Sequence, residues 1–526
     1  MIRQLSHIKY LQFFLFILAF ALYSSNIGGV SIYILDEAKN AGCASEMFQH
    51  ETLVVPTFND VLRTDKPPLH YFFMMLSFRI FGINPFAARF FSALFGACTV
   101  LITYLFSRKF DGKETAIWTS LVMLATIHLS IQFHLAVPDP YLIFFFVAGV
   151  MSFFAAIKEK RPIYLLFMYI SIGLGTLAKG PVAIALSGLI FFLFLIFSKR
   201  FSWSEIRALK PFTGALIVLL VALPWYILVH QQTNGVWTEG FFLRQNLERF
   251  TSKLEGHGGI FLITFGYVLA GMFPFSVFFG KTAIKTWKDR KDDLTLFLMI
   301  TALTIIIFFS LSRTKLPNYT VPAYPFLSIL VARYLMQTKA AKLKAGMIIL
   351  LTISIIIIPA LLIALKASAS FKEVSYVAWY FVPFTILLII SFSLWLKNNK
   401  EAALISVSGS GIIVSLIFFC LAFPPIDRKN PVTESLPLLK GKEIRYFEKF
   451  NPAYPFSLQK IIPSINENEF ETFFQKYPDG IIISLDKNIK KLKLPDNLEI
   501  SFSVRNTFDD RNTVLISKKE QNSKVR

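Results

Sequence analysis

Long apolar runs dominate the hydrophobic pattern of this chain. Between Tyr10 and Phe423 such runs recur, and at roughly 17 to 23 residues each could cross the hydrocarbon core of a bilayer as a helix. The run at residues 69–81 is shorter and contains Arg79, so we expect an interfacial helix there. The pattern therefore predicts an all-α polytopic membrane domain of about 13 transmembrane helices.

Clusters of basic residues follow every second predicted helix. Lysine and arginine are enriched in cytoplasmic loops, and placing all the clusters inside satisfies this rule at each step. If residues 69–81 also crossed the membrane, all later loops would change sides, and every basic cluster would lie outside. The clusters are Arg108, Lys109 and Lys113; Lys158, Lys160 and Arg161; Lys199, Arg200, Arg207 and Lys210; Lys281, Lys285, Lys288, Arg290 and Lys291; Lys339, Lys342 and Lys344; and Lys397 and Lys400.

This assignment fixes the expected side of every loop. The N-terminus lies inside, and the residues after Phe423 lie outside. We expect six external segments before that point. They are the large first loop 24–85, the turns near 138–140 and 179–181, the loop 231–259, the turn 313–325 and a short loop near 367–377.

The composition changes at Pro424 to that of a soluble domain. Short apolar runs at residues 481–485, 498–502 and 513–516 predict strands, and residues 467–476 predict a helix. About 100 residues suffice for a small α/β domain. We therefore predict two domains, a transmembrane domain at residues 1–423 and an external, periplasmic α/β domain at residues 424–526.

Composition and charge agree with a bilayer as the main partner. The chain has 526 residues, is 54% hydrophobic and carries a formal charge of +21. The topology explains this excess of basic residues through cytoplasmic loops and anionic headgroups, so we expect no nucleic-acid partner. No glycine-rich phosphate loop and no cysteine pattern occurs, so neither soluble nucleotide chemistry nor a disulfide framework is indicated.

Ionisable residues near membrane depth all fall on the predicted outer side. Such groups are costly beside hydrocarbon and mark functional sites by default. In "TDKPPLHY", Pro67 and Pro68 restrict the backbone and would hold Asp65 and Lys66 at the headgroup boundary, where a fixed cation suits a lipid phosphate. The full set is Asp36 and Glu37; Asp65 and Lys66; Asp139; Lys179; Arg244 and Arg249; and Arg313 and Lys315.

Each of these residues also has an ordinary interpretation. Asp139 could cap a turn in water, and Lys179 could extend its amine toward the headgroups. Glu37 and Lys39 could form a solvated pair on an interfacial helix. Other residues could simply face the membrane interface; these are Arg244, Arg249, Trp225 and Tyr226.

Several segments together resemble the GT-C membrane glycosyltransferases. "LDEAKNAGCASEM" and "VVPTFNDVLRTDKPPLHYFF" resemble the first external loop of that family, and "LAVPDPYLIFF", "GLGTLAKGPVAIAL", "LPWYILV" and "SRTKLPNYTVPAYPFLSIL" follow in the order of its later motifs. The branch most similar contains bacterial 4-amino-4-deoxy-L-arabinose (lipid A) transferases and dolichyl-phosphate-mannose–protein mannosyltransferase-like proteins. The resemblance extends to the region around Ala340.

The resemblance implies an enzyme of the bacterial inner membrane that transfers a sugar from a polyprenyl (undecaprenyl) phosphate. The acceptor would be lipid A, another glycan or a protein on the periplasmic side. Asp36 matches the catalytic acid of the family, Lys66 a ligand of the carrier phosphate and Asp139 a second acidic position. The wider candidate set adds Glu37 to the catalytic residues; Arg244, Arg249, Arg313 and Lys315 to the phosphate ligands; and Asp65, His70, Tyr71, Lys179, Tyr319 and Tyr324 to the substrate pocket.

Reaction chemistry agrees with these roles. Glycosyl transfer passes through an oxocarbenium-like transition state, and a lipid phosphate leaves as an anion that cations such as Lys66 can stabilise. One carboxylate, for which we choose Asp36, then takes the proton of the acceptor in a single inverting displacement. No cofactor is required. The acidic residues could gather a divalent metal ion, although their spacing does not demand one.

Two alternatives remain at this point. A transporter or flippase of a lipid-linked sugar would also place charges along a cavity, but transporters favour broken helices and similar halves around a midplane site. Another polyprenyl-phosphate glycan transferase or ligase would need the same charges.

Overall fold

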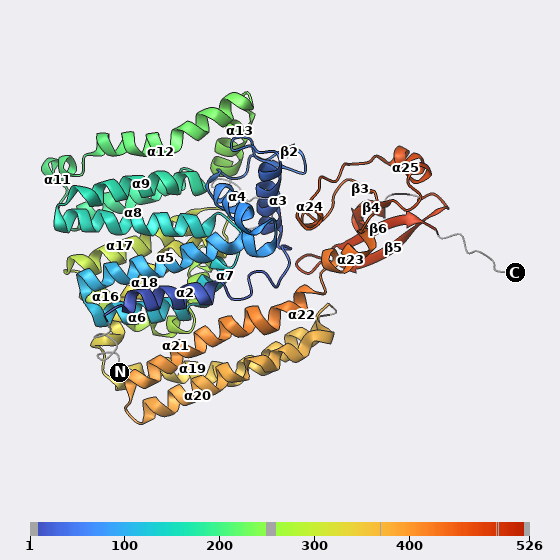
Figure 1. Ribbon diagram of the computed structural model, residues 1–526. Helices are drawn as coiled ribbons and strands as arrows, with labels where there is room; N and C mark the ends of the chain where they lie inside the picture. The colour runs from blue at the N-terminus through green and yellow to red at the C-terminus, as the bar shows by residue number, and fades with distance from the viewer. Residues whose placement is uncertain (1–8, 249–258, 369, 491, 493, 520–526) are drawn as a thin grey trace.

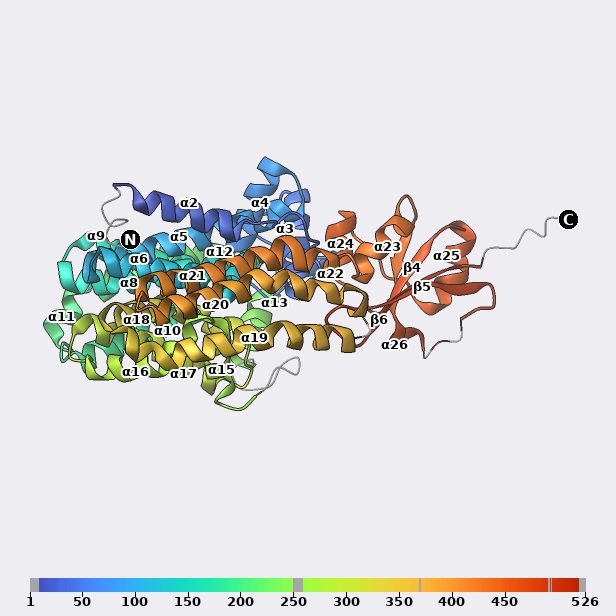
Figure 2. The same ribbon diagram turned by 90° about the horizontal axis from the view of Figure 1, so that it is seen from below.

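The computed structural model describes residues 9–248, 259–368, 370–490, 492 and 494–519. Figure 1 shows a bundle of long helices, with a small sheet beyond one end of the bundle. In the view of Figure 2 the sheet again lies beyond that end. The first 427 residues are almost entirely helical where the structure describes them.

Helices of this bundle begin and end as follows. They are α2 (Leu11–Tyr23), α3 (Leu35–Gln49), α4 (Leu69–Phe81), α5 (Pro85–Asp111), α6 (Lys113–Ala125), α7 (Ile127–Phe133), α8 (Asp139–Glu159), α9 (Pro162–Lys179), α10 (Val182–Phe197), α11 (Trp203–Ala208), α12 (Pro211–Gln232), α13 (Val236–Glu239), η1 (Gly240–Glu248), α15 (Ile263–Gly271), η2 (Phe275–Phe278), α16 (Phe279–Lys288), α17 (Asp293–Leu311), η3 (Pro317–Ala323), α18 (Tyr324–Gln337), η4 (Ala340–Leu343), α19 (Lys344–Ala367), η5 (Lys372–Phe381), α20 (Val382–Leu396), α21 (Lys400–Ile417), η6 (Phe418–Ala422) and α22 (Phe423–Asp427).

Many of these helices are suited to a bilayer by length and composition. Among the described residues, eight are long and apolar enough to cross a membrane, or ten when two bent helix pairs each count as one span. One bent pair joins α6 to α7 and the other joins α15 to α16. The predicted membrane domain is thus mostly helical, as the apolar runs indicate.

The predicted basic loops gather at one end of the bundle, where ion pairs join them. Lys158 and Arg200 both contact Asp293 at 2.6 Å, although they follow different helices. Arg333 contacts Asp111 at 3.3 Å and Asp292 at 2.8 Å. These pairs connect the ends of α5, α8, α10 and α18 to the start of α17.

Helix α4, which spans residues 69–81, lies at the opposite end, beside α3 and near the sheet (Figure 1). Its buried residues recur at helical spacing and include Tyr71, Met74 and Phe78, whereas Leu76 and Ile80 are exposed. One face therefore packs on the protein and the other is free to contact lipid, as expected of an interfacial helix.

The C-terminal segment contains a four-stranded sheet with the order β3-β4-β6-β5. β4 pairs parallel to β3 and antiparallel to β6. The three predicted strands form, whereas β3 was not predicted because its short "IRY" sequence has no apolar run. The elements are α23 (Pro431–Leu439), β3 (Ile444–Tyr446), α24 (Ala453–Leu458), η7 (Glu467–Glu469), α25 (Phe470–Lys476), β4 (Ile481–Leu485), α26 (Asp486–Ile489), β5 (Leu498–Arg505) and β6 (Asn512–Lys518).

The C-terminal segment is hydrogen-bonded to the first loop, which contains the small hairpin of β1 (Thr57–Phe58) and β2 (Val61–Leu62). The Asn59 side chain donates to the Ile462 carbonyl at 2.9 Å and accepts from the Ile462 N–H at 2.8 Å. The Asp427 carboxylate accepts from both the N–H and the hydroxyl of Ser31. The first loop is therefore held between the helix bundle and the sheet.

Candidate active site

Helix α3 carries the first acidic pair and is anchored by one of its two carboxylates. The Arg89 guanidinium on α5 donates to the two Glu37 oxygens at 2.7 and 2.8 Å, and the Ala136 N–H donates to one of them at 2.8 Å. Glu37 is fully buried. It therefore does not form a solvated pair with Lys39, and the geometry favours a structural role over the catalytic role that the sequence suggests.

Asp36, the neighbour of Glu37, lies on the exposed side of α3. Successive residues of a helix point about 100° apart, so anchoring Glu37 in the protein directs Asp36 away from that core. Asp36 acts electrostatically on the buried Arg63 and His70, as does Lys66 on His70. The fold thus brings Asp36 and Lys66 to the same region at one end of the bundle.

Arg63 organises the segment that contains the "TDKPP" motif. Its guanidinium donates to the Asn40 amide oxygen at 3.1 Å and to the Tyr71 hydroxyl at 3.2 Å, and it lies 3.4 Å from Asp65. This network ties the motif to α3 through Asn40 and to α4 through Tyr71. Lys66 follows in the same segment and is buried, so the lysine is held in place rather than extended into water.

Two tryptophans are hydrogen-bonded to backbone carbonyls of the first loop. The Trp237 indole donates to the Arg63 carbonyl at 2.9 Å, and the Trp225 indole donates to the Leu53 carbonyl at 3.1 Å. Trp225 and Tyr226 are buried and pack against Trp237. The alternative that Trp225 and Tyr226 simply face the membrane interface therefore does not fit, because both are buried: Trp225 is hydrogen-bonded to the first loop, and the Tyr226 hydroxyl donates to the Thr176 carbonyl.

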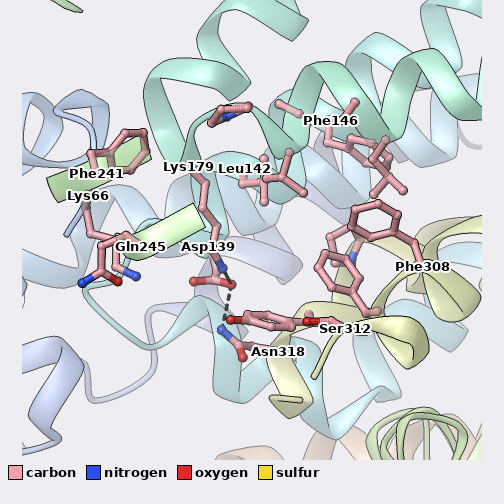
Figure 3. Close-up of a pocket in the computed structure, with 18 of the residues that line it drawn as sticks. Lys66, Asp139, Leu142, Phe146, Lys179, Phe241, Gln245, Phe308, Ser312 and Asn318 are labelled. Carbon is pink, nitrogen blue, oxygen red and sulfur yellow. Dashed lines mark hydrogen bonds and ion pairs between the residues drawn. The ribbon is translucent and has the colours of Figure 1, made fainter. Parts of the chain in front are cut away.

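A cavity of about 410 Å³ lies beside the motif. The polar residues of its lining include Asp65, Lys66, Asp139, Lys179, Gln245, Ser312 and Asn318. Phe146 and Phe308 belong to its apolar wall (Figure 3). A lining that combines charged groups with aromatic rings suits a ligand that joins a polar headgroup to a hydrocarbon chain.

Asp139 and Lys179 form an ion pair in this cavity. The Lys179 amine lies 2.6 Å from the Asp139 carboxylate, which also accepts from the Asn318 amide at 2.9 Å (Figure 3). Lys179 lies 5.2 Å from the centre of the Tyr319 ring, within cation–π range. Neither a solvated turn cap for Asp139 nor a lysine reaching the headgroups is correct, because the two residues neutralise each other inside the protein.

The end of α9 places Lys179 at this point. Gly180 ends the helix with a φ of +85°, a conformation that side chains with a Cβ rarely adopt. A Cβ at Gly180 would also approach the Phe241 ring to 2.5 Å. The glycine therefore allows both the sharp turn after Lys179 and the close packing of Phe241, which lines the cavity.

The remaining predicted site residues lie in several places. Asp65 and Tyr319 line the cavity, and Asp65 accepts from the Gln245 amide at 2.9 Å. Residues that do not line it are His70 and Tyr71, buried on α4; Tyr324, whose hydroxyl lies 3.0 Å from His128; Lys315, buried against the Ser312 carbonyl; and Arg313, which is exposed. Arg244 belongs to η1, and Arg249 lies outside the described residues.

Five polar residues of the site were not predicted. They are Asn40, Arg63, Gln245, Ser312 and Asn318. Arg63 lies three residues before Lys66, within the quoted first-loop segment "VVPTFNDVLRTDKPPLHYFF". Its charge and position could therefore have marked it as a site residue. Asparagine and glutamine carry no charge, and nothing in the local pattern separates Asn318 from an ordinary loop residue.

Metal ligands are not clustered in this region. Across the described ranges, no group of three or more histidine, cysteine, aspartate or glutamate side chains is arranged to hold a metal ion. Asp139, Asp65 and Glu37 are instead paired with Lys179, Arg63 and Arg89, respectively.

Comparison with known proteins shows a relationship to membrane glycosyltransferases. A family model described as dolichyl-phosphate-mannose-protein mannosyltransferase matches residues 65–228. An uncharacterized protein of Aquifex aeolicus (strain VF5) is 30% identical over 306 residues, which cover 58% of this chain and 68% of the relative. The undecaprenyl phosphate-alpha-4-amino-4-deoxy-L-arabinose arabinosyl transferase of Enterobacter sp. (strain 638) is 27% identical over 58% of this chain, and the match spans 56% of that relative.

A solved structure shares the fold over nearly the whole chain. The crystal structure of ArnT from Cupriavidus metallidurans bound to undecaprenyl phosphate superposes with a TM-score of 0.81 at 20% identity. The match covers 96% of this chain and 97% of that structure. The two proteins therefore have the same architecture, including the C-terminal region.

Proposed function

This chain belongs to the GT-C membrane glycosyltransferases of the dolichyl-phosphate-mannose–protein mannosyltransferase and arabinosyl transferase type, and from this premise we propose how it works. It is an integral membrane enzyme that uses a polyprenyl-phosphate sugar donor. We propose undecaprenyl phosphate as the carrier, because the Enterobacter relative is named for it. The proposed acceptor is a hydroxyl or phosphate of lipid A, another glycan or a protein.

We propose a membrane domain of 13 spans at residues 1–423 and an α/β domain at residues 424–526. The spans are α2, α5, α6 with α7, α8, α9, α10, α12, α15 with α16, α17, α18, α19, α20 and α21. The convergence of the basic loops at one end supports a cytoplasmic location for that end. The cavity, α3 and the C-terminal sheet then lie on the periplasmic side of the inner membrane.

One observation carries the functional proposal. The cavity combines a buried lysine of the first loop with an internal ion pair and an apolar aromatic wall, and Asp36 lies on the exposed side of the adjacent helix α3. A lipid-linked sugar has matching parts, because its phosphate is anionic, its sugar is polar and its carrier chain is hydrocarbon. Asp65 and Gln245, which are hydrogen-bonded to each other, line the same cavity beside Lys66.

In the proposed reaction Lys66 binds the phosphate of the donor. Asp139, Lys179 and Asn318 bind hydroxyl or amino groups of the sugar. The acceptor oxygen forms a bond to the anomeric carbon while the bond from that carbon to the phosphate oxygen breaks. Asp36 takes the acceptor proton, and the polyprenyl phosphate leaves with the bonding electrons as an anion that Lys66 stabilises. The product has the inverted anomeric configuration.

Transport of the lipid-linked sugar is not favoured. A transporter needs a site that opens to either side, usually near the bilayer midplane between similar halves. Here the charged lining residues come from helix ends and loops on one side of the bundle. Their location fits a reaction at one membrane surface.

An assay with purified protein tests this function. With a polyprenyl-phosphate sugar and an acceptor, we expect release of free polyprenyl phosphate, and we expect Asp36→Asn to lower kcat at least about 100-fold because the general base is lost. Glu51→Gln, at an exposed position just after α3, is the matched control and should keep normal activity. Movement of intact donor across vesicles without bond cleavage, or full activity of Asp36→Asn, would contradict the proposal.

A further inference from the structure

A second and larger cavity lies along the outside of α10 and α17. Its volume is about 980 Å³, and its lining comes from α10, α17 and the segment around the end of α16. Its basic lining residues lie where the basic loops gather, at the end of the bundle opposite the charged residues of the active-site cavity. The transferase chemistry proposed above uses none of its basic residues.

The long wall of this groove is apolar. On α17 it is formed by residues at helical spacing, which are Leu296, Met299, Ile300, Leu303, Ile307 and Leu311. With a rise of 1.5 Å per residue, this face is about 22 Å long, whereas one leaflet of hydrocarbon is about 15 Å thick. The groove is therefore long enough to hold an acyl chain of a lipid from the nearer leaflet.

The mouth of the groove is basic and aromatic. Lys199, Arg290 and Lys291 line it, together with Trp287. The Arg290 guanidinium lies over the Trp287 ring at 4.3 Å, and it donates to the Trp287 carbonyl. An indole at this level is typical of the boundary between headgroups and hydrocarbon.

The charges at this mouth are not neutralised by the acid that lines it. Asp293 also lines the groove, but its carboxylate is engaged at 2.6 Å by both Lys158 and Arg200. Lys199 and Lys291 are exposed, and neither forms an ion pair with any other residue that the structure describes. Two lysines and one arginine thus line the headgroup end of an apolar groove without an ion-paired acid among the described residues.

We propose that this groove binds one anionic glycerophospholipid from the leaflet opposite the active site. Lys199, Lys291 and Arg290 contact its phosphate, and an acyl chain lies between α10 and α17. Basic pockets between transmembrane helices on the cytoplasmic side are suited to such headgroups. The site is separate from that of the sugar donor, whose phosphate we assign to Lys66 at the other end of the bundle.

The position of the groove also connects it to the active-site cavity. Phe308 lines both cavities, and its ring forms part of the active-site wall in Figure 3. A lipid chain in the groove would therefore pack on the outer side of a residue that the donor contacts on the inner side.

Binding of defined lipids to the purified, delipidated protein tests the proposal. Native mass spectrometry and lipid-induced shifts of the melting temperature would compare phosphatidylglycerol with phosphatidylcholine of the same acyl chains. We expect phosphatidylglycerol to bind at least about tenfold more tightly, because the basic residues at the mouth attract its anionic headgroup and the zwitterionic headgroup of phosphatidylcholine carries no net charge.

Matched variants separate this site from general surface charge. Lys199→Gln with Lys291→Gln should remove the preference for phosphatidylglycerol, whereas Lys281→Gln with Lys288→Gln, at exposed positions on α16 that do not line the groove, should retain it. Ile307→Trp, which fills the groove but keeps its charges, should also weaken binding. Transferase activity provides the check of folding for every variant.

Three results would overturn the proposal. Equal affinity for the two lipids would show that the basic mouth does not select charge. An equal loss in both double variants would show that only net charge matters. An equal shift with soluble glycerol phosphate would show a site for free phosphate compounds rather than for a lipid.

Discussion

Two buried ion pairs near the same end of the bundle differ in what surrounds them. The pair of Glu37 and Arg89 is sealed, with side chains only 1% and 4% exposed. The pair of Asp139 and Lys179 lines the active-site cavity, with side chains 8% and 16% exposed. Each pair joins an acid on one helix to a base on another, α3 to α5 in the first case and the consecutive helices α8 and α9 in the second.

The two pairs also differ in how many hydrogen-bond donors of the basic residue are already used. Arg89 donates to Glu37 and also to the carbonyls of Ile27, Val30 and Ser31, so its guanidinium has no capacity left for a ligand. Lys179 donates to the Asp139 carboxylate and has three N–H donors in all, so in the proposed reaction it can bind a sugar while it still neutralises Asp139. Burial and charge alone therefore do not identify a site, and we base the proposed site on a pair that keeps spare donors and lines a cavity.

The largest effect is expected from breaking the sealed pair. Arg89→Met leaves Glu37 buried without a counter-ion, which should cost about 3–5 kcal/mol of folding stability. The apparent melting temperature in detergent measures this loss. Adding Glu37→Gln should restore part of it, and Arg79→Met, at an exposed position on α4, should change stability by less than about 0.5 kcal/mol. If the Arg89→Met protein were folded and as stable as the unmodified chain, the pair of Glu37 and Arg89 would not have the structural role that separates it from the pair of Asp139 and Lys179.

Breaking the cavity pair should instead affect catalysis. We expect Lys179→Met to lower kcat/KM about 100-fold, equivalent to about 2.7 kcal/mol of transition-state stabilisation, because the sugar loses a charged donor. The melting temperature should fall less than in Arg89→Met, since the cavity admits water to Asp139. Steady-state kinetics per folded molecule provide the measurement, and Lys179→Arg should recover part of the rate. Normal kinetics together with a large loss of stability would show that this pair, like Glu37 and Arg89, only stabilises the fold.

The smallest effect concerns His70, a buried base in the same region. Burial lowers its pKa well below 6.5, and Arg63 and Lys66 add to this, opposed by the Pro67 carbonyl and Asp36. The unfolded chain therefore binds a proton as the pH falls below about 6.5 while the folded protein does not, so stability is lost by up to about 1.4 kcal/mol per pH unit.

A pH series of melting temperatures checks the role of His70. His70→Gln, which retains an amide that can donate to Asn40, should melt with a weaker dependence on pH between 7 and 5 than the unmodified chain. His50→Gln, at an exposed position, serves as the control. The same pH dependence in all three proteins would show that another group is responsible.

Local sequence was a reliable guide to the elements of this protein. Apolar run length predicts helices because a span must satisfy its own backbone in hydrocarbon, and the resulting segments form. The short β-rich runs near the C-terminus also form strands. The interfacial position of α4 was predicted from the basic clusters that follow every second predicted helix. That pattern extends over most of the chain.

Sequence alone determined the membrane class, the grouping of the basic loops and the motif around Lys66, because these depend on composition and on short spacing. The tertiary structure decided which acid is sealed and which is available. Glu37 and Asp139 look alike in sequence, but Arg89 lies 52 residues from Glu37 and Lys179 lies 40 residues from Asp139. Pairings over such separations depend on how the helices pack, and packing is a property of the whole chain.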